Sequence, residues 1–327
     1  MGEAKLSKEE IRRIKQLNRS LVSLPKPTQQ SLGILAVQRE DGVFFLGNNQ
    51  YVKIYLVKPA VLNEKKKQLV TKLCEITGNR IRITSFCKTY NQRLIAYTFM
   101  AVYYKAYNYA GAYDEISEFE KRLNEEVCRN LGITISKCAL DDALVYMRMN
   151  CSGELKIIEH SDMMSKNGDW KKNLFADVSE TKAGTFQCLE KYGVCFTGNF
   201  YDNSNINIDN ILMQIPGNIL FAVEIQKVDE EDEKLLKHEL TNKYSVDCDI
   251  EESTVNMKYL MSVMFEDETT RNEVKKTIMS LYDQNKILLN PCSGREKEAY
   301  YSLCSIGVID FHSMRNASTE QAGSLLI

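Results

Sequence analysis

The chain has little or nothing of several features that mark particular protein classes. Its 327 residues include 5 prolines, which argues against long disordered stretches. No apolar run approaches the roughly 18 residues that a membrane-spanning helix needs. Basic and acidic residues nearly cancel, at 42 against 44, so the net charge does not favour binding of nucleic acid. The composition still allows a local basic patch that could bind it. A globular chain long enough for two ordinary domains fits these bounds.

The common catalytic and cofactor-binding motifs are missing as well. The sequence contains no G-x-x-x-x-G-K-[ST] loop, which would cradle the phosphates of a nucleotide. It contains no G-x-G-x-x-G after a strand, no H-E-x-x-H, no G-x-S-x-G and no EF-hand loop. The three histidines have no Cys or Asp pattern around them that suggests a catalytic set. We therefore expect no bound cofactor, no metal and no catalytic residue.

Cysteine is plentiful, but its spacing is uninformative. With no C-x-x-C pair, no signal peptide and few histidines, neither a zinc site nor a secreted disulfide framework is supported. Most cysteines fall inside apolar periodic segments, so we expect buried free thiols in a reducing cytoplasm. The ten positions are 74, 87, 128, 138, 151, 188, 195, 248, 292 and 304.

Three other features have both a functional and a structural interpretation. Adjacent carboxylates at Asp141-Asp142 and in the block 229–233 could bind Mg²⁺, but helix starts explain both more simply. Trp170 could anchor a partner, although docking its own segment onto the chain is the simpler role. A run of tyrosines could stack on bases, while a role in the core and at its rim is favoured. The run comprises Tyr97, Tyr103, Tyr104, Tyr107, Tyr109 and Tyr113.

The first segment predicts a basic amphipathic helix. Ser7 and Glu10 form an S-x-x-E capping box, and residues 11, 14, 17 and 21 place isoleucines and leucines on one face. The remaining surface is crowded with basic residues, and the "PKPT" stretch then ends the helix. This helix, together with Trp170, is the candidate docking site for a partner or a membrane surface, while packing of the helix on its own domain explains its apolar row equally well. The basic candidates for docking are Arg12, Arg13, Lys15 and Arg19.

Hydrophobic periodicity divides the rest into two similar halves around a polar connection. Each half alternates strand pairs with single helices, as in split β-α-β units, so we predict an α+β fold. In each of its two domains, an antiparallel-rich, ferredoxin-like sheet carries helices on one face. The predicted division is a leader and linker at 1–29, a first domain at 30–151, a connector at 152–182 and a second domain at 183–327. The clearest elements are helices at 114–132 and 270–281 and strands at 218–227 and 254–265.

Two stretches of the sequence resemble one known family. In "TQQSLGILAVQREDGVFFLGNNQYVKIYLV" a Q-x-x-L entry precedes a strand, an Asp-Gly turn and a Y-x-K-x-Y strand. The final stretch combines an aromatic-Ser-Leu-x-x-x-Gly run with Arg, a Thr-x-x-Ala helix start and Leu-Leu. This pattern is similar to the amino-terminal region of the VirB-four, TraC and TrbE type of traffic ATPase. The matching positions are Gln30, Leu32, Asp41, Gly42, Tyr51, Lys53, Tyr55, Tyr301, Ser302, Leu303, Gly307, Arg315, Thr319, Ala322, Leu325 and Leu326.

The resemblance implies a non-catalytic docking and assembly module for type IV secretion or conjugation. It implies partners among inner-membrane channel subunits, an ATPase motor domain or full-length homologue, and other copies in an oligomer. The expected location is cytoplasmic and peripheral, on the inner face of the cell membrane. The family's Walker A strand and helix would lie beyond Ile327, so this chain is expected not to be an ATPase by itself. Two alternatives stay open: a stand-alone nucleic-acid-binding module, and an unrecognised enzyme that uses a cysteine or a carboxylate.

Overall fold

A computed structural model describes most of the chain. The described residues are 7–9, 11–12, 33–58, 63–153, 178–181, 184–200, 207–229, 231–232, 234–235, 238, 254–285, 287–306 and 315–326. Of the predicted leader helix, Ile11 donates from its backbone N–H to the carbonyl of Ser7 at 3.0 Å, and Arg12 is exposed. The other docking candidates, Arg13, Lys15, Arg19 and Trp170, lie outside the described residues.

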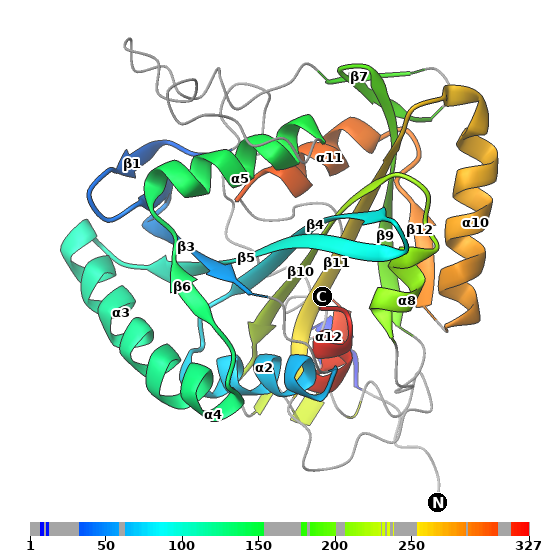
Figure 1. Ribbon diagram of the computed structural model, residues 1–327. Coiled ribbons are helices and arrows are strands. Elements are labelled where there is room, and N and C mark those ends of the chain that lie inside the picture. The colour runs from blue at the N-terminus through cyan, green and yellow to red at the C-terminus, as the bar shows by residue number, and fades with distance from the viewer. Residues whose placement is uncertain are drawn as a thin grey trace, which may run out of the picture.

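The first half of the fold begins with a hairpin and ends with a helix (Figure 1). Strand β3 and helix α2 lead into the long hairpin β4–β5, and a helical run follows in which α3, a π-helical turn and α4 are continuous. The elements are β1 (Ala36–Gln38), β2 (Val43–Gly47), β3 (Gln50–Val57), α2 (Asn63–Ile76), β4 (Ile81–Tyr90), β5 (Arg93–Lys105), α3 (Tyr109–Arg122), the π-helix (Leu123–Cys128), α4 (Arg129–Leu131), β6 (Ile135–Lys137) and α5 (Leu140–Ser152).

The second half repeats this sequence of elements. Its components are β7 (Val178–Glu180), β8 (Phe186–Cys188), β9 (Lys191–Phe200), α8 (Ile208–Met213), β10 (Asn218–Lys227), β11 (Thr254–Phe265), a short 3-10 turn (Glu268–Thr270), α10 (Arg271–Gln284), β12 (Ile287–Pro291) and α11 (Glu296–Cys304). A last strand and helix follow, β13 (Arg315–Ser318) and α12 (Thr319–Ser324). We call residues 36–152 the first repeat and residues 178–304 the second repeat.

The two repeats agree in strand pairing as well as in order. In the first repeat, β3 pairs with β5 on one side and with β2 and β6 on the other, and β5 pairs in turn with β4. In the second repeat, β9 pairs with β11 on one side and with β8 and β12 on the other, and β11 pairs in turn with β10. The backbone N–H of Cys138 donates to Ile54 at 3.2 Å, and that of Cys292 donates to Cys195 at 2.9 Å. Each repeat is therefore a split β-α-β unit with an added hairpin before it and an added helix after it.

The two repeats share one sheet. Strand β4 pairs with β10 in antiparallel register from Ile81 opposite Ile225 to Lys88 opposite Asn218, and this pairing joins them into a 13-stranded sheet. The sequence analysis expected a separate sheet in each domain. Periodicity identifies a strand but not its neighbour across an edge, and here the edge strand of one unit pairs with the edge strand of the other.

Both faces of this sheet are covered. One core contains apolar side chains from α2, α3, α8 and α10, and the other contains side chains from α5 and α11. The α+β class and the antiparallel sheet are confirmed, whereas the expectation of helices on one face alone is not. Strands buried on both faces explain why few of them alternate cleanly between apolar and polar residues.

The segment 315–326 ties the second half back to the first. Strand β13 pairs with β11, and α12 begins with a capping box in which Ser318 and Gln321 exchange side-chain and backbone hydrogen bonds. Helix α12 packs on α2, where the hydroxyl of Thr71 donates to that of Thr319 at 2.8 Å. The two helices lie together at the lower end of the sheet in Figure 1.

Candidate functional site

A charged hollow opens in the first repeat between the turn before β2, strand β3, helix α3 and the start of α5. Its volume is about 550 Å³. The tight turn that forms one wall depends on Gly42, whose φ is +60°. A Cβ on Gly42 would lie 3.2 Å from the backbone nitrogen of Leu140, so glycine lets this turn pack directly on the start of α5. The charged residues that line the hollow are Arg39, Glu40, Asp41, Lys53, Glu120, Lys137 and Asp141.

A buried lysine lies in the wall of the hollow. Lys53 is 6 % exposed, and its amine donates to the backbone carbonyl of Asp41. Burial is the main cause that lowers the pKa of Lys53, and nearby Glu120 partly offsets this effect. The amine thus ties the turn to β3, and it places a weakly solvated cation beside the hollow.

Glu120 is the central carboxylate. It forms an ion pair with Lys137 of β6 and accepts a hydrogen bond from the hydroxyl of Tyr55 at 3.5 Å. Tyr55 in turn lies 3.2 Å from the hydroxyl of Tyr104. Because Glu120 is held by groups on β3 and β6, α3 is fixed over the edge of the sheet.

The second repeat serves as an internal control for this site. The carbonyls of Ile54 and Cys195 accept equivalent backbone hydrogen bonds, so these two residues occupy the same position in the two repeats. Lys53, which precedes Ile54, therefore corresponds to Val194. Val194 is fully buried in the core, as is Phe196, which takes the place of Tyr55. Lysine and tyrosine in the first repeat therefore replace two core residues that the same fold accepts in the second.

A lysine also holds the equivalent turn of the second repeat, but it comes from another element. Lys275 of α10 donates to the carbonyl of Gly184 at 2.8 Å, and Gly184 has a φ of +69°, as Gly42 has +60°. Holding the turn is thus a structural task common to both repeats. The lysine and tyrosine of β3 have apolar counterparts on β9, and this difference marks the hollow as a candidate for binding.

The hollow offers charged and hydrogen-bonding groups for binding. Cys138 lies in its wall, and burial raises the pKa of this thiol to about 12, so the thiolate needed for attack does not form near neutral pH. Among the described residues, no cluster of three or more His, Cys, Asp or Glu side chains is arranged to hold a metal ion. The arrangement suits recognition of a partner segment that carries charges of both signs.

Five residues that carry the family resemblance gather around this site. Asp41 and Gly42 form the turn, and Lys53 and Tyr55 lie on β3 beside the hollow. The ring centroids of Tyr51 and Tyr109 lie 6.3 Å apart in a tilted arrangement. The Tyr109 hydroxyl donates to the carboxylate of Asp41. The sequence analysis did not identify this site, although Lys53 between two apolar neighbours in a buried strand was a signal.

The earlier candidates are scattered. Asp141 and Asp142 lie in the first turn of α5, as a helix start predicts. Of the tyrosine run, Tyr103 and Tyr104 are buried, while Tyr97, Tyr107 and Tyr113 are exposed. Within the part of the chain that the structure describes, no helix is both long and apolar enough to cross a membrane.

The nine described cysteines are free and eight of them are buried, which confirms the prediction of buried free thiols for those eight. No protein-family model and no curated protein sequence matches the chain.

Proposed function

We propose that this chain is a non-catalytic docking and assembly module of a traffic ATPase of type IV secretion or conjugation. In this role it joins the motor to inner-membrane channel subunits and to neighbouring copies, at the inner face of the cell membrane. The observation that carries the proposal is that Asp41 and Lys53, which belong to the resembling motif, line one charged hollow and are hydrogen-bonded to each other, while Tyr55 of the same motif donates to Glu120 of the lining.

The construction of the fold supports this role. A continuous sheet, covered on both faces by helices, is a rigid platform, and binding sites that rest on such elements are well positioned. Several described residues of the second matching stretch are also buried. Leu303 is buried in α11, and Ala322, Leu325 and Leu326 pack in the core beside α2.

A photo-crosslinking experiment in the native host tests the proposal. A photoreactive amino acid replaces Ser117, which is exposed on α3 and lines the hollow, and the captured proteins are identified by mass spectrometry. The same replacement at Ser280, exposed on α10, is the matched control. The expected result is capture of a motor ATPase or a membrane channel subunit at position 117 and not at position 280.

The alternatives give different results in this experiment. Equal capture at both positions, or capture of neither a motor nor a channel subunit at position 117, contradicts the proposal. Recovery of crosslinked DNA from position 117 would favour the nucleic-acid-binding module instead.

A further inference from the structure

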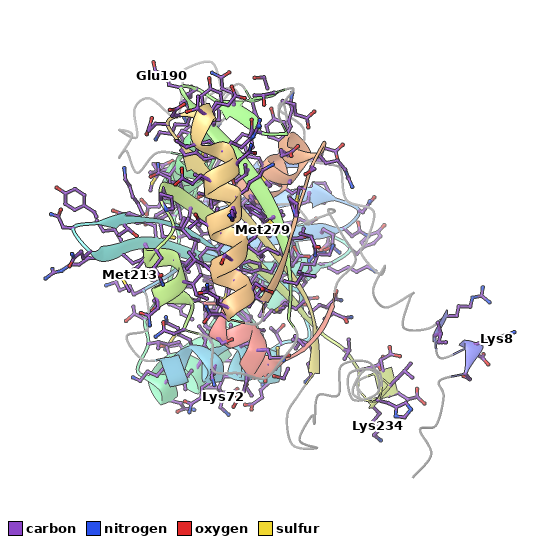
Figure 2. All side chains as sticks on the ribbon, turned by 90° about the vertical axis from the view of Figure 1, so that its right-hand side faces the viewer. Lys8, Lys72, Glu190, Met213, Lys234 and Met279 are labelled. Carbon is purple, nitrogen blue, oxygen red and sulfur yellow. The ribbon has the colours of Figure 1, made fainter. Side chains whose placement is uncertain are left out.

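One end of the β4–β5 hairpin extends beyond the rest of the sheet. Strand β4 pairs with β10 only as far as Lys88, and beyond this point β4 and β5 continue as a two-stranded arm. Asn91 and Gln92 close it with φ values of 48° and 60°, as a two-residue type I′ turn requires. Figure 2 shows this cyan hairpin projecting from the body of the molecule at the left. We call residues 88–97 the β4–β5 arm.

One face of the arm carries all of its large exposed side chains. Tyr90 lies opposite Arg93 and Lys88 lies opposite Ile95, and residues paired in this way share a face of the sheet. Tyr97 follows on the same face, since side chains two residues apart along a strand point to the same side. The exposed fractions are 61 % for Tyr90, 41 % for Ile95 and 37 % for Tyr97.

The opposite face of the arm is anchored to the molecule. Leu94 and Ala96 pack against the core that contains α2, α3 and α8. The hydroxyl of Thr89 donates to the carbonyl of Met213, next to the end of α8, at 3.4 Å. The exposed face is thus presented from a supported hairpin. Tyr90 and Ile95 are exposed on it, while the ring of Tyr97, at the base of the arm, lies 6.4 Å from that of Tyr146 on α5.

The arm is positively charged and therefore favours a negatively charged partner. Residues 88–97 include Lys88 and Arg93 and no acidic residue, in a chain that has 44 Asp and Glu. Both cations lie on the exposed face, at the same end of the hairpin as the two tyrosines. Tyrosine beside lysine and arginine is the composition that proteins place at the interface between water and lipid.

The size and chemistry of the arm favour lipid over other anionic surfaces. A stable protein interface buries about 800 Å² on each partner, which five side chains on a narrow hairpin do not provide. Binding of single-stranded nucleic acid uses successive aromatic platforms, whereas the arm places the aliphatic Ile95 between its aromatic residues. A bilayer surface needs only a few apolar groups with cations at the lipid headgroups.

We propose that the β4–β5 arm docks on an anionic membrane leaflet, with Tyr90, Ile95 and Tyr97 at the lipid interface and Lys88 and Arg93 on acidic headgroups. The inference deepens the proposed function and rests on it for the location of the chain at the inner membrane. The proposed function describes contacts with protein partners, whereas this inference adds a direct contact between the arm and lipid.

Flotation of the full chain with vesicles tests the proposal. One set of vesicles is phosphatidylcholine alone, and the other contains an equal amount of phosphatidylserine. The charge variant is Lys88→Gln with Arg93→Gln, and its control is Lys234→Gln with Lys276→Gln, at two exposed lysines outside the arm. The apolar variant is Tyr90→Ser with Ile95→Ser, and its control is Met279→Ser on α10.

The expected result is binding to the anionic vesicles that falls as salt rises. Each basic residue contributes about fivefold near an anionic leaflet, so the charge variant should bind roughly 25-fold more weakly at low salt. The apolar variant should lose binding at both salt concentrations, and the controls should bind like the wild type. Unchanged urea midpoints for all variants show that folding is intact.

Several outcomes overturn the inference. One is a wild type that does not float with anionic vesicles at low salt; another is arm variants that float like their controls. Loss of single-stranded DNA binding in the arm variants, with vesicle binding unchanged, assigns the arm to nucleic acid instead. Crosslinking of a motor or channel subunit from Ser117 is independent of these results, so the arm and the proposed function fail separately.

Discussion

Arg82 of β4 donates from Nη2 to the backbone carbonyl of Ser302 on α11 at 2.7 Å. The same nitrogen donates to the carbonyl of Leu303 at 2.8 Å, so an arginine of the first repeat binds the last turn of a helix of the second. Carbonyls in the last turn of a helix lack partners within the helix, and a cation there also complements the helix dipole. Arg82 itself is 1 % exposed, so water does not replace these bonds.

Removing this guanidinium should destabilise the whole molecule. We expect Arg82→Met to lower the free energy of unfolding by about 3 kcal/mol, because the buried carbonyls of Ser302 and Leu303 lose a charged donor. The matched control is Arg295→Met, whose exposed pair with Glu298 should be worth less than about 1 kcal/mol. Urea unfolding measures both, and equal losses would show that Arg82 does not join the repeats.

The contact of α12 with α2 depends on a glycine. A Cβ on Gly323 would lie 2.4 Å from the Cα of Lys67 and 2.8 Å from the carbonyl oxygen of Lys66. Backbone atoms cannot move aside as a flexible side chain can, so Gly323→Ala should cost roughly 2 kcal/mol of stability. A Cβ on Gly78 meets nothing within 4 Å, and Gly78→Ala should change stability by less than about 1 kcal/mol. Thermal unfolding compares the two, and a neutral Gly323→Ala would contradict the docked position of α12.

Alkaline pH should unfold the protein through its buried tyrosines. The hydroxyls of Tyr259 and Tyr282 lie 2.8 Å apart in the core, and burial raises the pKa of both. An acid whose pKa is higher when folded stabilises the fold fully below its unfolded pKa of about 10, and this contribution is lost as pH rises further. Lys53 and Lys275, whose pKa values burial lowers, act in the opposite direction but are fewer. Burial raises the pKa of Tyr55, Tyr103, Tyr104, Tyr259, Tyr282 and Tyr300.

The expected slope is about 1.4 kcal/mol per pH unit for each such tyrosine above pH 10. Urea midpoints measured across this range, together with tyrosinate absorbance, check it. Tyr282→Phe removes one titrating hydroxyl, so the slope should become shallower by about 1.4 kcal/mol per pH unit. A stability that stays constant above pH 10 would show that these hydroxyls are not buried.

The cysteines should resist modification in the folded protein. Eight of the nine described thiols are buried, and Cys128 is half-buried with its pKa raised by burial. We expect a water-soluble thiol reagent to label Cys128 slowly and the buried ones only after denaturant is added, since a protonated, buried thiol neither reacts nor is reached. Mass spectrometry after timed labelling gives the order. Rapid labelling of any one buried cysteine would revive the cysteine-enzyme alternative.

The chain should neither bind nor hydrolyse ATP. No glycine-rich backbone loop followed by lysine is present in the sequence to hold the phosphates. Isothermal titration with Mg-ATP and a phosphate-release assay check this expectation. Stoichiometric binding at micromolar affinity would contradict it.

Local patterns in the sequence predicted the elements well where one face dominates. In the helix predicted at 114–132, the apolar row Ile116, Phe119, Leu123 and Val127 indicates one buried face, and all four residues are buried. The π-helical turn at Leu123–Cys128 within this run was not predicted, because one extra residue in a turn leaves no mark in an apolar row. The odd-numbered row from Val255 to Phe265 is buried as expected.

Capping and pairing were harder to predict. Thr270 and Glu273 have the spacing of a capping box in the sequence, but the hydroxyl of Thr270 donates to the carbonyl of Asp267, and Asp267 caps a 3-10 turn that begins earlier. Two acceptable caps three residues apart cannot be ranked by sequence alone. The union of β4 with β10 depends on contacts between residues more than a hundred positions apart, which periodicity does not encode.

The duplication could have been read from the sequence, and the charged hollow could not. The order of strands and helices predicted for the two halves is nearly the same, and a comparison of the two would have shown the repeat. Lys53, Glu120 and Lys137 come from three elements, and only their packing brings them to one place. The first repeat has Lys53 where the second has Val194, and this difference becomes visible only once the pairing registers of β3 and β9 are known.

The antiparallel pairing of β4 with β10 has a mechanical consequence. The ladder between Ile81–Ile225 and Lys88–Asn218 is the direct connection between the two halves of the sheet. A force that slides the strands past each other loads all of these hydrogen bonds at once, whereas a force across the strands opens them one after another. If the two repeats are held by different neighbours in an assembly, the molecule is therefore stiff to shear along the central strands and compliant to peeling across them.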